Sequence, residues 1–356
     1  MKYTSIETQK EIPIYIGENI LKDLKQYLSK LDFDKIIIIT DTNVNKLWSK
    51  ILSKELSTFK HDFFILKAGE KSKNFKTYEK LCNDILDKEI TRKSLIIAFG
   101  GGVVGNMSGF IAATLFRGIK FIHIPTTIMA QADSTTGGKQ AINSKHGKNI
   151  IGTFYEPEFI LIDSQFLQTL PEREIKCGIA ECIKHALCQD RILLEELLNK
   201  NKDKNYLFKI ILKTIELKLN IIESDRKEIN EGKILVYGHT IGHAIETLAK
   251  GKLNHGESIS IGMICVANIS YLLGYLNEKD MNKHYETLNY WGLPTKIPKE
   301  IKLNSILKQL NYDKKFKDSN IELILLEKIG KILKNKNKIG IEITENDLKK
   351  YLSNCY

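Results

Sequence analysis

The stretch that decides the fold is residues 94–105, SLIIAFGGGVVG. Its first half is a short apolar run, typical of a strand buried on both faces. Its second half is rich in glycine and leads into apolar residues 107–115, which favour a helix. Glycines lack Cβ atoms, so their N–H groups can approach a pyrophosphate whose charge the helix N-terminus favours. The order strand, glycine turn, helix therefore predicts a nucleotide-binding turn, with a tight packing turn as the alternative.

The glycines at 100, 101, 102 and 105 do not follow the GxGxxG spacing, so the common dehydrogenase form of this fold is not implied. Strand signals recur on both sides of the turn, in the short apolar runs 36–40, 62–67 and 121–124, and residues 75–90 have helical spacing. Strands that alternate with helices of this length predict βαβ units and a parallel sheet.

The pattern changes from about residue 171, after which helical spacing continues almost unbroken to residue 273. A short hairpin is expected between 321–326 and 331–333. We therefore predict an α/β, Rossmann-like nucleotide-binding domain over residues 1–165. A mainly α-helical domain is predicted over residues 166–356.

Composition limits the class of protein. The chain has 356 residues, 42% of them hydrophobic and 27% charged, which suits two globular domains. Its net charge of +11 comes from scattered lysines without an interleaved aromatic motif, so nucleic-acid binding is only a weak alternative. We see no apolar leader and no stretch of membrane-spanning length, and expect a cytoplasmic protein without a membrane partner. The six cysteines form no CxxC pair and are expected to be free thiols.

Three histidines lie close together in the second half of the chain. His239 and His243 are four residues apart, which places both imidazoles on one helix face, and His255 follows shortly after. Glu181 lies in another predicted helix. A catalytic metal site needs about three protein ligands and an open position, so Glu181 with two of the histidines would suffice. The residues alone do not say which two. The alternatives are ordinary polar histidines and a solvent-exposed Glu181–Lys184 pair.

Several cations lie in segments that are otherwise apolar or rich in glycine. A lysine is usually solvated surface, but in such segments it is a better candidate for binding anions or hydroxyl groups. The candidates, which include one amide, are Arg117, Lys139, Asn149, Lys184 and Lys218.

Together these segments resemble the 3-dehydroquinate synthase superfamily, the sugar phosphate cyclases. The similar stretches are residues 100–105, 116–119, 125–127, 133–143, 147–149, 178–184, 237–246 and 255–257. The resemblance implies a dehydroquinate synthase-like fold, NAD and a divalent metal, zinc or cobalt, as cofactors, and a homodimer. It also implies a reaction with transient oxidation of the sugar by NAD, phosphate elimination, reduction, ring opening and an intramolecular aldol closure.

The resemblance assigns roles to individual residues. It implies metal binding by Glu181, His239 and His255. It implies catalytic roles for Asp133, Lys139, Glu181, Lys184 and His243. The implied NAD contacts are Asp41, Glu70, Lys73, Gly101, Gly102, Val103, Asn106, Thr126, Thr127, Lys139 and Lys148. The implied contacts with the sugar phosphate are Arg117, donated by the neighbouring subunit, and Asp133, Lys139, Asn149, Lys184, Lys218, His243 and Lys315.

Four positions bear on which cyclase this is. Gly232 stands where 3-dehydroquinate synthase has an arginine for the substrate carboxylate, and Val236, Asn106 and Gln140 also depart from that enzyme. Several segments look closer to 2-deoxy-scyllo-inosose synthase, which cyclises glucose 6-phosphate. We therefore expect a substrate without a carboxylate. The alternative is 3-dehydroquinate synthase, with Lys233 as a possible carboxylate partner, and a further alternative is an NAD-dependent polyol-phosphate dehydrogenase.

Overall fold

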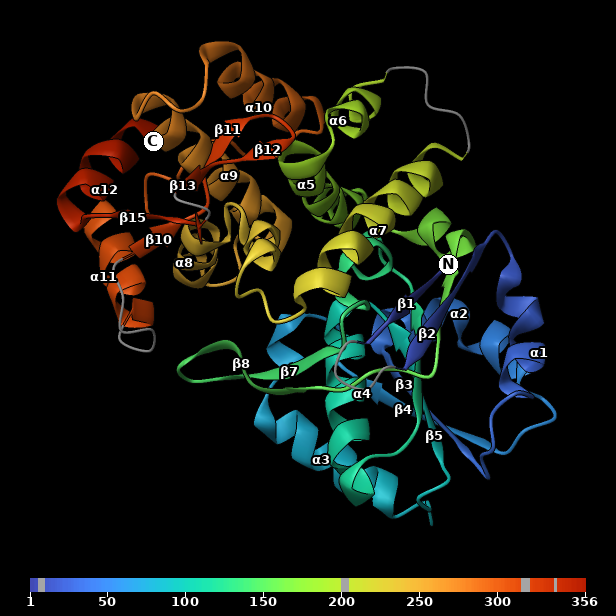
Figure 1. The fold of residues 1–356 in the computed structure, drawn as a ribbon. Coiled ribbons are helices and arrows are strands. Elements are labelled where there is room, and N and C mark those ends of the chain that lie inside the picture. Colours follow the sequence, from blue (N-terminus) through green and yellow to red (C-terminus); the bar gives the residue numbers. More distant parts are fainter. Residues whose placement is uncertain (6–9, 200–204, 315–320, 336–337) are drawn as a thin grey trace. The chain divides into compact units, whose positions relative to one another are not determined.

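The computed structural model describes residues 1–5, 10–199, 205–314, 321–335 and 338–356. The chain forms two compact units, Met1–Pro171 and Glu172–Tyr356. The first is a parallel sheet covered by helices and the second is mainly helical (Figure 1). The predicted fold class is therefore confirmed.

The main sheet of the first unit has the strand order β1-β2-β9-β6-β5-β3-β4. Its neighbouring strands run parallel except for β1 and β2, which pair antiparallel. The strands are β1 (Lys2–Thr4), β2 (Glu11–Gly17), β3 (Ile36–Asp41), β4 (His61–Leu66), β5 (Leu95–Gly100), β6 (Phe121–Pro125) and β9 (Ile160–Asp163).

The isoleucine run of β3 is buried on both faces of the sheet. Ile36 and Ile38 pack into a core with η1 (Ile20–Asp23), α1 (Leu24–Leu28) and α2 (Thr42–Glu55). Ile37 and Ile39 point to the opposite core, formed with α3 (Phe75–Leu86) and α4 (Gly102–Thr114). Because successive side chains of a strand alternate between faces, two helical layers require apolar residues at every position.

A hairpin that the sequence does not predict completes this unit. Strands β7 (Lys139–Ser144) and β8 (Gly147–Phe154) pair antiparallel, and most of β8 is exposed. The short helices of this unit, besides η1, are η2 (Glu70–Ser72), η3 (Leu115–Arg117), η4 (Ala130–Ser134), a π-helix, and η5 (Ser164–Thr169).

In the second unit, α9 is the buried central helix and packs against α5, α8, α10 and α12. The elements are α5 (Glu172–Gln189), α6 (Arg191–Leu197), α7 (Tyr206–Asp225), η6 (Glu231–Val236), α8 (His239–Ala249), α9 (His255–Leu272), α10 (Glu278–Tyr290), α11 (Leu303–Lys314), α12 (Glu345–Leu352) and η7 (Ser353–Cys355). No helix among the described residues is both long enough and apolar enough to span a membrane. All six cysteines are free thiols.

The predicted hairpin near the C-terminus is only partly right. Leu326 pairs with Ile332 as expected, but Ile321 pairs with Ile343, far beyond the predicted partner strand. The small strands are β10 (Ile321–Leu323), β11 (Leu326–Lys328), β12 (Lys331–Ile332), β13 (Lys334–Asn335), β14 (Lys338–Ile339) and β15 (Ile341–Ile343).

Candidate active site

The residues predicted to bind NAD follow the carboxyl ends of parallel strands in the first unit. Asp41 ends β3, Gly101 follows β5 and Thr126 follows β6, so all three lie at one edge of the sheet. From β3 the chain passes to β4 on one side and later to β5 on the other, so the strand order reverses at this point. In open α/β sheets, ligands bind in the crevice at such a reversal.

The glycine turn lies at the N-terminus of α4, where Gly101 is the N-cap residue and Gly102 and Val103 begin the helix. A Cβ atom on Gly101 would lie 3.0 Å from Thr127 Cγ2, and one on Gly102 would lie 3.2 Å from Ser134 Oγ. Larger side chains would fill the approach to the helix N-terminus, so the turn fits a ligand that comes close to the backbone.

Two hydroxyl groups in the same part of the unit support a ligand there. The Oγ1 atom of Thr126 and the Oγ atom of Ser134 are buried and form no hydrogen bond within the described part of the chain. A buried polar group without a partner is costly, and a ligand oxygen could satisfy each one. Asp41 already uses one carboxylate oxygen within the protein. That oxygen caps α2 by accepting from the Asn43 N–H at 2.8 Å and the Val44 N–H at 3.1 Å.

Several of the predicted polar residues of this unit form one hydrogen-bond network. The buried Lys73 ammonium donates to the side-chain oxygens of Asn106 and Asn149. The side-chain amide of Asn106 donates to the backbone carbonyl of Lys139 at 3.2 Å. The structure therefore brings together residues assigned to the cofactor and residues assigned to the sugar phosphate.

Asn143, which was not predicted as a site residue, extends this network. Its side-chain amide donates to Glu70 at 2.7 Å, and its side-chain oxygen accepts from the Asn149 N–H at 3.0 Å. Lys148 Nζ lies 3.9 Å from the same Glu70 oxygen. Asn143 thus links the β7–β8 hairpin to the turn that follows β4.

The turn that carries Arg117 has an unusual backbone. Phe116, Arg117 and Gly118 have φ angles of 52°, 66° and 122° in succession. Left-handed conformations cost about 1–2 kcal/mol for residues other than glycine, and such strain is concentrated at functional sites. The Arg117 side chain is exposed. Asp133 lies half-buried in η4, and its carbonyl accepts from the Thr136 hydroxyl at 3.0 Å.

In the second unit, a carboxylate and two imidazoles from three helices meet at one point. The Oε1 atom of Glu181, on α5, lies 3.3 Å from His239 Nε2 and 3.1 Å from His255 Nε2. His239 begins α8 and His255 begins α9. Tetrahedral zinc sites with bonds of about 2.0–2.1 Å have ligand–ligand separations of about 3.3 Å, and the distances from Glu181 to both histidines match this value. We call these three residues the Glu–His–His cluster.

The second nitrogen of each imidazole is fixed by a partner. Nδ1 of His239 lies 3.0 Å from the Tyr237 carbonyl, and Nδ1 of His255 lies 3.2 Å from a carboxylate oxygen of Glu246. A carbonyl oxygen only accepts, so Nδ1 of His239 carries a proton, and Nε2 is the ring nitrogen that faces Glu181. Such outer partners hold metal-binding histidines in the correct orientation and tautomer.

His243 belongs to the same group of side chains but is more exposed. Its ring centroid lies 5.1 Å from that of His239 and 5.6 Å from that of His255. One ring nitrogen from each of the three histidines lies within 4.8 Å of the others. Since Glu181 contacts His239 and His255, these two fit the metal-ligand role best and His243 borders the cluster.

Lys184 forms a buried pair with Glu181, so the solvent-exposed i,i+3 pair considered from the sequence is wrong. Its Nζ atom lies 2.6 Å from Glu181 Oε2 and donates to the Leu235 carbonyl at 2.8 Å. Both side chains are almost fully buried. Burial of a charged pair is costly, which makes such a pair a candidate for function. Lys218 is also buried, on α7, while Lys315 lies outside the described residues.

The electrostatics of the cluster favour a cation. Burial alone would raise the pKa of Glu181, but Lys184 and His239 outweigh it and hold that pKa well below the ordinary value. Burial alone would lower the pKa of His255, whereas its hydrogen bonds to Glu181 and Glu246 raise it to about 9. The carboxylate is thus ionised and the site holds positive charge, as a proton or as a metal ion in its place.

Glycines allow the three helices to approach each other closely enough. A Cβ atom on Gly262 of α9 would lie 2.1 Å from the Gly238 carbonyl oxygen and 2.8 Å from the Gly242 nitrogen. One on Gly256 would lie 2.4 Å from the Cys177 carbonyl oxygen of α5. Close backbone packing of α9 on α8 and α5 therefore sets the positions of the candidate metal ligands.

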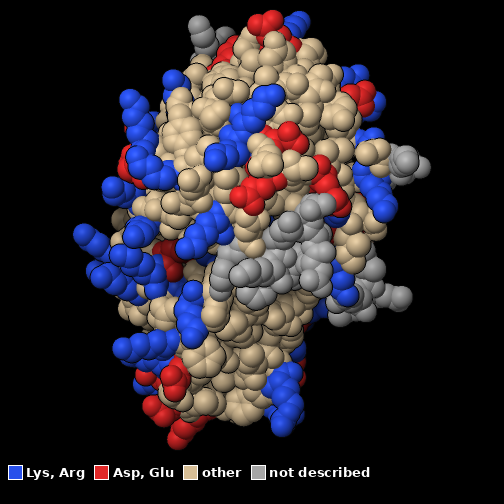
Figure 2. Space-filling model, turned by 90° about the vertical axis from the view of Figure 1, so that its left-hand side faces the viewer, with Lys and Arg blue, Asp and Glu red and all other residues tan. Residues whose placement is uncertain are grey.

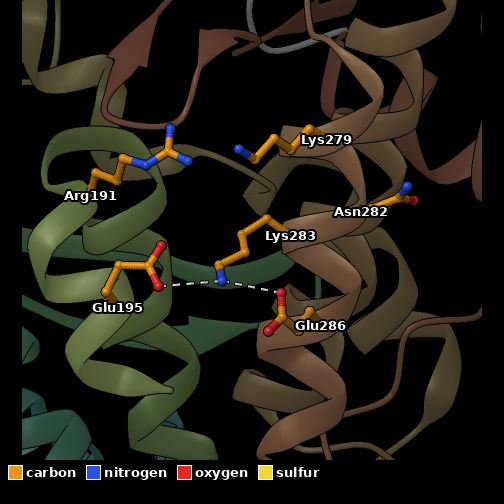
Figure 3. A pocket seen from close by; sticks show the side chains of 6 residues that line it. All are labelled: Arg191, Glu195, Lys279, Asn282, Lys283 and Glu286. Atoms are coloured by element: carbon orange, nitrogen blue, oxygen red, sulfur yellow. Dashed lines mark ion pairs between the residues drawn. The ribbon is translucent and has the colours of Figure 1, made fainter. Parts of the chain in front are cut away.

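The surface offers a separate hollow of about 460 Å³ between α6 and α10. In Figure 3, Lys283 reaches between two carboxylates that line the hollow. Its Nζ atom lies 3.4 Å from Glu195 and 3.1 Å from Glu286. No residue assigned from the sequence lines it. Lys and Arg side chains are spread over the face in Figure 2 with acidic side chains among them.

Comparison with known proteins decides the family. Residues 63–177 match the model of the 3-dehydroquinate synthase N-terminal domain, and residues 178–316 match that of its C-terminal domain. The 3-dehydroquinate synthase of Leptospira interrogans is 38% identical over 328 residues, which cover 90% of each chain. That of Thermoanaerobacter pseudethanolicus is 40% identical and covers 91% of this chain and 93% of its own. The chain belongs to the 3-dehydroquinate synthase family.

Solved structures agree with this membership. A 2-deoxy-scyllo-inosose synthase complexed with carbaglucose-6-phosphate, NAD⁺ and Co²⁺ is 29% identical, covers 100% of both chains and has a TM-score of 0.89. A 2-epi-5-epi-valiolone synthase from Streptomyces hygroscopicus, 21% identical with a TM-score of 0.87, shares the fold. The resemblance to sugar phosphate cyclases is therefore confirmed, and the protein is an enzyme of this family.

Within the family fold, sequence reasoning missed the residues that support the site. Glu246 could have been found, because it lies seven residues after His239 and therefore on the same helix face. Asn143 lies in the β7–β8 hairpin and Ser134 at a buried turn. The roles of both depend on contacts that no local pattern encodes.

Proposed function

We propose that the protein is a 3-dehydroquinate synthase, which converts 3-deoxy-arabino-heptulosonate 7-phosphate to 3-dehydroquinate with release of phosphate. Relatives that carry this name are 38–40% identical over about 90% of both chains. This support outweighs our expectation from the sequence of a substrate without a carboxylate. NAD and a divalent metal, zinc or cobalt, are the proposed cofactors.

The Glu–His–His cluster is the observation that carries the chemistry. Its Oε1 atom lies at metal-ligand spacing from the two Nε2 atoms, and all three side chains also contact an outer partner. A bound divalent ion would act as a Lewis acid on a substrate oxygen. Glu181, His239 and His255 would hold it and leave a position open for the substrate.

The surrounding cations are proposed to act on the substrate. The Lys184 ammonium, held by Glu181 and by the Leu235 carbonyl, can donate to a substrate oxygen on which negative charge develops. We assign ring and hydroxyl contacts to Asp133 and Lys218. The phosphate-binding residues would be Lys139, Asn149, His243, Lys315 and the partner subunit's Arg117 in a homodimer.

The edge of the first unit is proposed to bind NAD. The turn at Gly101 and Gly102 would receive the pyrophosphate, and Thr126 and Ser134 have buried hydroxyls that can donate to the ligand. Asp41 and Thr127 flank this turn. Glu70, Lys73, Val103, Asn106 and Lys148 complete the proposed set. We also propose that the nucleotide and metal functions divide between an N-terminal and a C-terminal domain, in a cytoplasmic protein.

One observation favours a second candidate, cyclisation of glucose 6-phosphate. Gly232 has no side chain, and a Cβ atom there would lie 2.4 Å from the Asp225 carbonyl oxygen. The neighbouring Lys233 ammonium is paired with Glu322 at 2.8 Å. Neither residue considered as a partner for the substrate carboxylate is thus ready to bind one. A receptor elsewhere is required for the heptulosonate substrate.

A phosphate-release assay tests the proposal. The protein is incubated with NAD and Co²⁺, and each sugar phosphate is supplied separately. We expect inorganic phosphate from the heptulosonate phosphate, with NAD unchanged at the end of the reaction. Release from glucose 6-phosphate alone would favour the second candidate. Stoichiometric NADH without phosphate would contradict both and indicate a polyol-phosphate dehydrogenase.

A further inference from the structure

Tyr237 is fully buried and forms hydrogen bonds through both its backbone and its side chain. Its carbonyl accepts from Nδ1 of His239 at 3.0 Å. Its hydroxyl lies 3.0 Å from Nε2 of His284, on α10. One residue therefore connects a proposed metal ligand to a buried histidine on a different helix.

The direction of these hydrogen bonds follows from the acceptors. Nδ1 of His284 lies 2.7 Å from the Asp280 carbonyl, which only accepts, so Nδ1 carries a proton. Burial lowers the pKa of His284 to about 4, so the ring is neutral at pH 7 and its Nε2 accepts. The Tyr237 hydroxyl therefore donates to His284, and the bond has a fixed direction.

At the other end of this series of hydrogen bonds, His284 is held firmly in place. His284 is completely buried one helical turn after Asp280, whose side chain is also buried. The Asp280 N–H donates to the Asn277 side chain at 2.8 Å, and its carboxylate accepts from the Ile329 N–H at 3.1 Å. His284 thus offers the Tyr237 hydroxyl a fixed acceptor.

The backbone carbonyl of Tyr237 depends on this fixed acceptor for its direction. Gly238 follows Tyr237 in the left-handed region, with φ of 73°, and joins it to α8. Glycine has no side chain to restrict its backbone, so the direction of the Tyr237 carbonyl depends on tertiary contacts at this junction. An anchored Tyr237 side chain would set it.

We propose that Tyr237 and His284 are positioning residues for the metal site. Their hydrogen bond holds the Tyr237 carbonyl against Nδ1 of His239, which keeps Nε2 of His239 directed toward the proposed metal position beside Glu181. This inference rests on the proposed function, because it assumes that His239 binds a metal. The alternative is that the two groups only satisfy each other's buried polar atoms.

Removal of one hydroxyl tests the inference. Co²⁺ is titrated into metal-free protein, and its affinity is read from the visible absorption of the bound ion. We expect Tyr237→Phe to weaken Co²⁺ binding about tenfold, because the carbonyl that orients His239 loses its anchor, an effect at the low end of those caused by losing an outer partner. Tyr285→Phe is the matched control, since it removes a hydroxyl from α10 that is hydrogen-bonded at 2.9 Å to Asn268. The control should bind Co²⁺ like the wild type.

A double variant separates positioning from simple burial. Tyr237→Phe leaves Nε2 of His284 without a donor, whereas Tyr237→Phe with His284→Leu removes both polar partners. We expect the double variant to recover thermal stability but not Co²⁺ affinity. Unchanged affinity in Tyr237→Phe, or recovery of both properties in the double variant, would overturn the inference. Wild-type protein that binds no Co²⁺ would overturn the proposed function and the inference together.

Discussion

The Nε2 atom of His255 lies 3.1 Å from a carboxylate oxygen of Glu181, although 74 residues separate them in the chain. Helix α9 begins at His255, and the glycines at 256 and 262 allow it to pack against α5 and α8. The proposed chemistry therefore depends on how closely three helices pack as well as on the residues that they present.

Loss of the carboxylate should remove the metal. We expect Glu181→Gln to lower metal affinity by at least about 100-fold and to abolish turnover, since it removes a direct ligand. Metal content and phosphate release are measured together, and circular dichroism checks the fold. Glu172→Gln changes an exposed carboxylate of the same helix and should leave both properties intact. A Glu181→Gln protein that keeps its metal would exclude this residue as a ligand.

Close packing of α9 on α8 should be as important for metal binding as the ligands themselves. Gly262→Ala places a Cβ atom against the backbone of Gly238 and Gly242, which cannot yield as a side chain can. We expect a loss of about 1–3 kcal/mol in unfolding free energy and weaker metal binding. Gly147→Ala is the control, because its Cβ atom would meet only the flexible Ile150 side chain. Equal stability and metal affinity in the two variants would be inconsistent with the packing argument.

The glycine turn should control NAD affinity. We expect Gly102→Val to raise the NAD dissociation constant at least about tenfold, because the new side chain obstructs the helix N-terminus. Calorimetric titration with NAD measures this effect. Ala113→Val introduces the same side chain near the other end of α4 and should bind NAD normally. A similar loss in both variants would point to damage of the helix rather than to the turn.

A buried histidine should make the protein less stable in acid. Burial lowers the pKa of His123 to about 3 from an ordinary value of 6.5. Below pH 6.5 the unfolded chain binds a proton that the folded chain does not, so stability falls as the pH drops toward 3. From His123 alone, the free energy of unfolding should fall by about 2 kcal/mol between pH 8 and pH 5.

His123→Leu tests this by urea denaturation at several pH values. Nε2 of His123 has no hydrogen-bond partner among the described residues, so an apolar replacement breaks no bond there. We expect a smaller loss of stability between pH 8 and pH 5 than in the wild type. Parallel pH profiles for the two proteins would rule out His123 as the source.

The parts of the fold that local pattern determines could be predicted. Residues 36–39 are isoleucines because the strand is covered on both faces, so composition alone identifies a buried parallel strand. Residues 147–154 could not be recognised, because β8 is exposed and its apolar side chains at 150 and 151 do not alternate with polar ones. The pairing of Ile321 with Ile343 was missed because it joins segments that are not adjacent in the chain.

The same distinction applies to the site. The spacing of His239 and His243 predicts that they share a helix face, and they do. The approach of Glu181 to His255 depends on tertiary packing. The residue types therefore indicated a site of Glu181 with two histidines, and only the family resemblance indicated which two. Taken singly, the spacing of Glu181 and Lys184 favours a solvent-exposed pair. The local pattern does not show that η6 lies against Lys184, whose ammonium donates to the Leu235 carbonyl.

Anomalous diffraction at the zinc edge, from crystals grown with Zn²⁺, tests the central claim most directly. We predict a single strong peak with bonds of about 2.0–2.2 Å to Glu181, to Nε2 of His239 and to Nε2 of His255. A zinc ion bound elsewhere, or held by His243 without Glu181, would contradict the account.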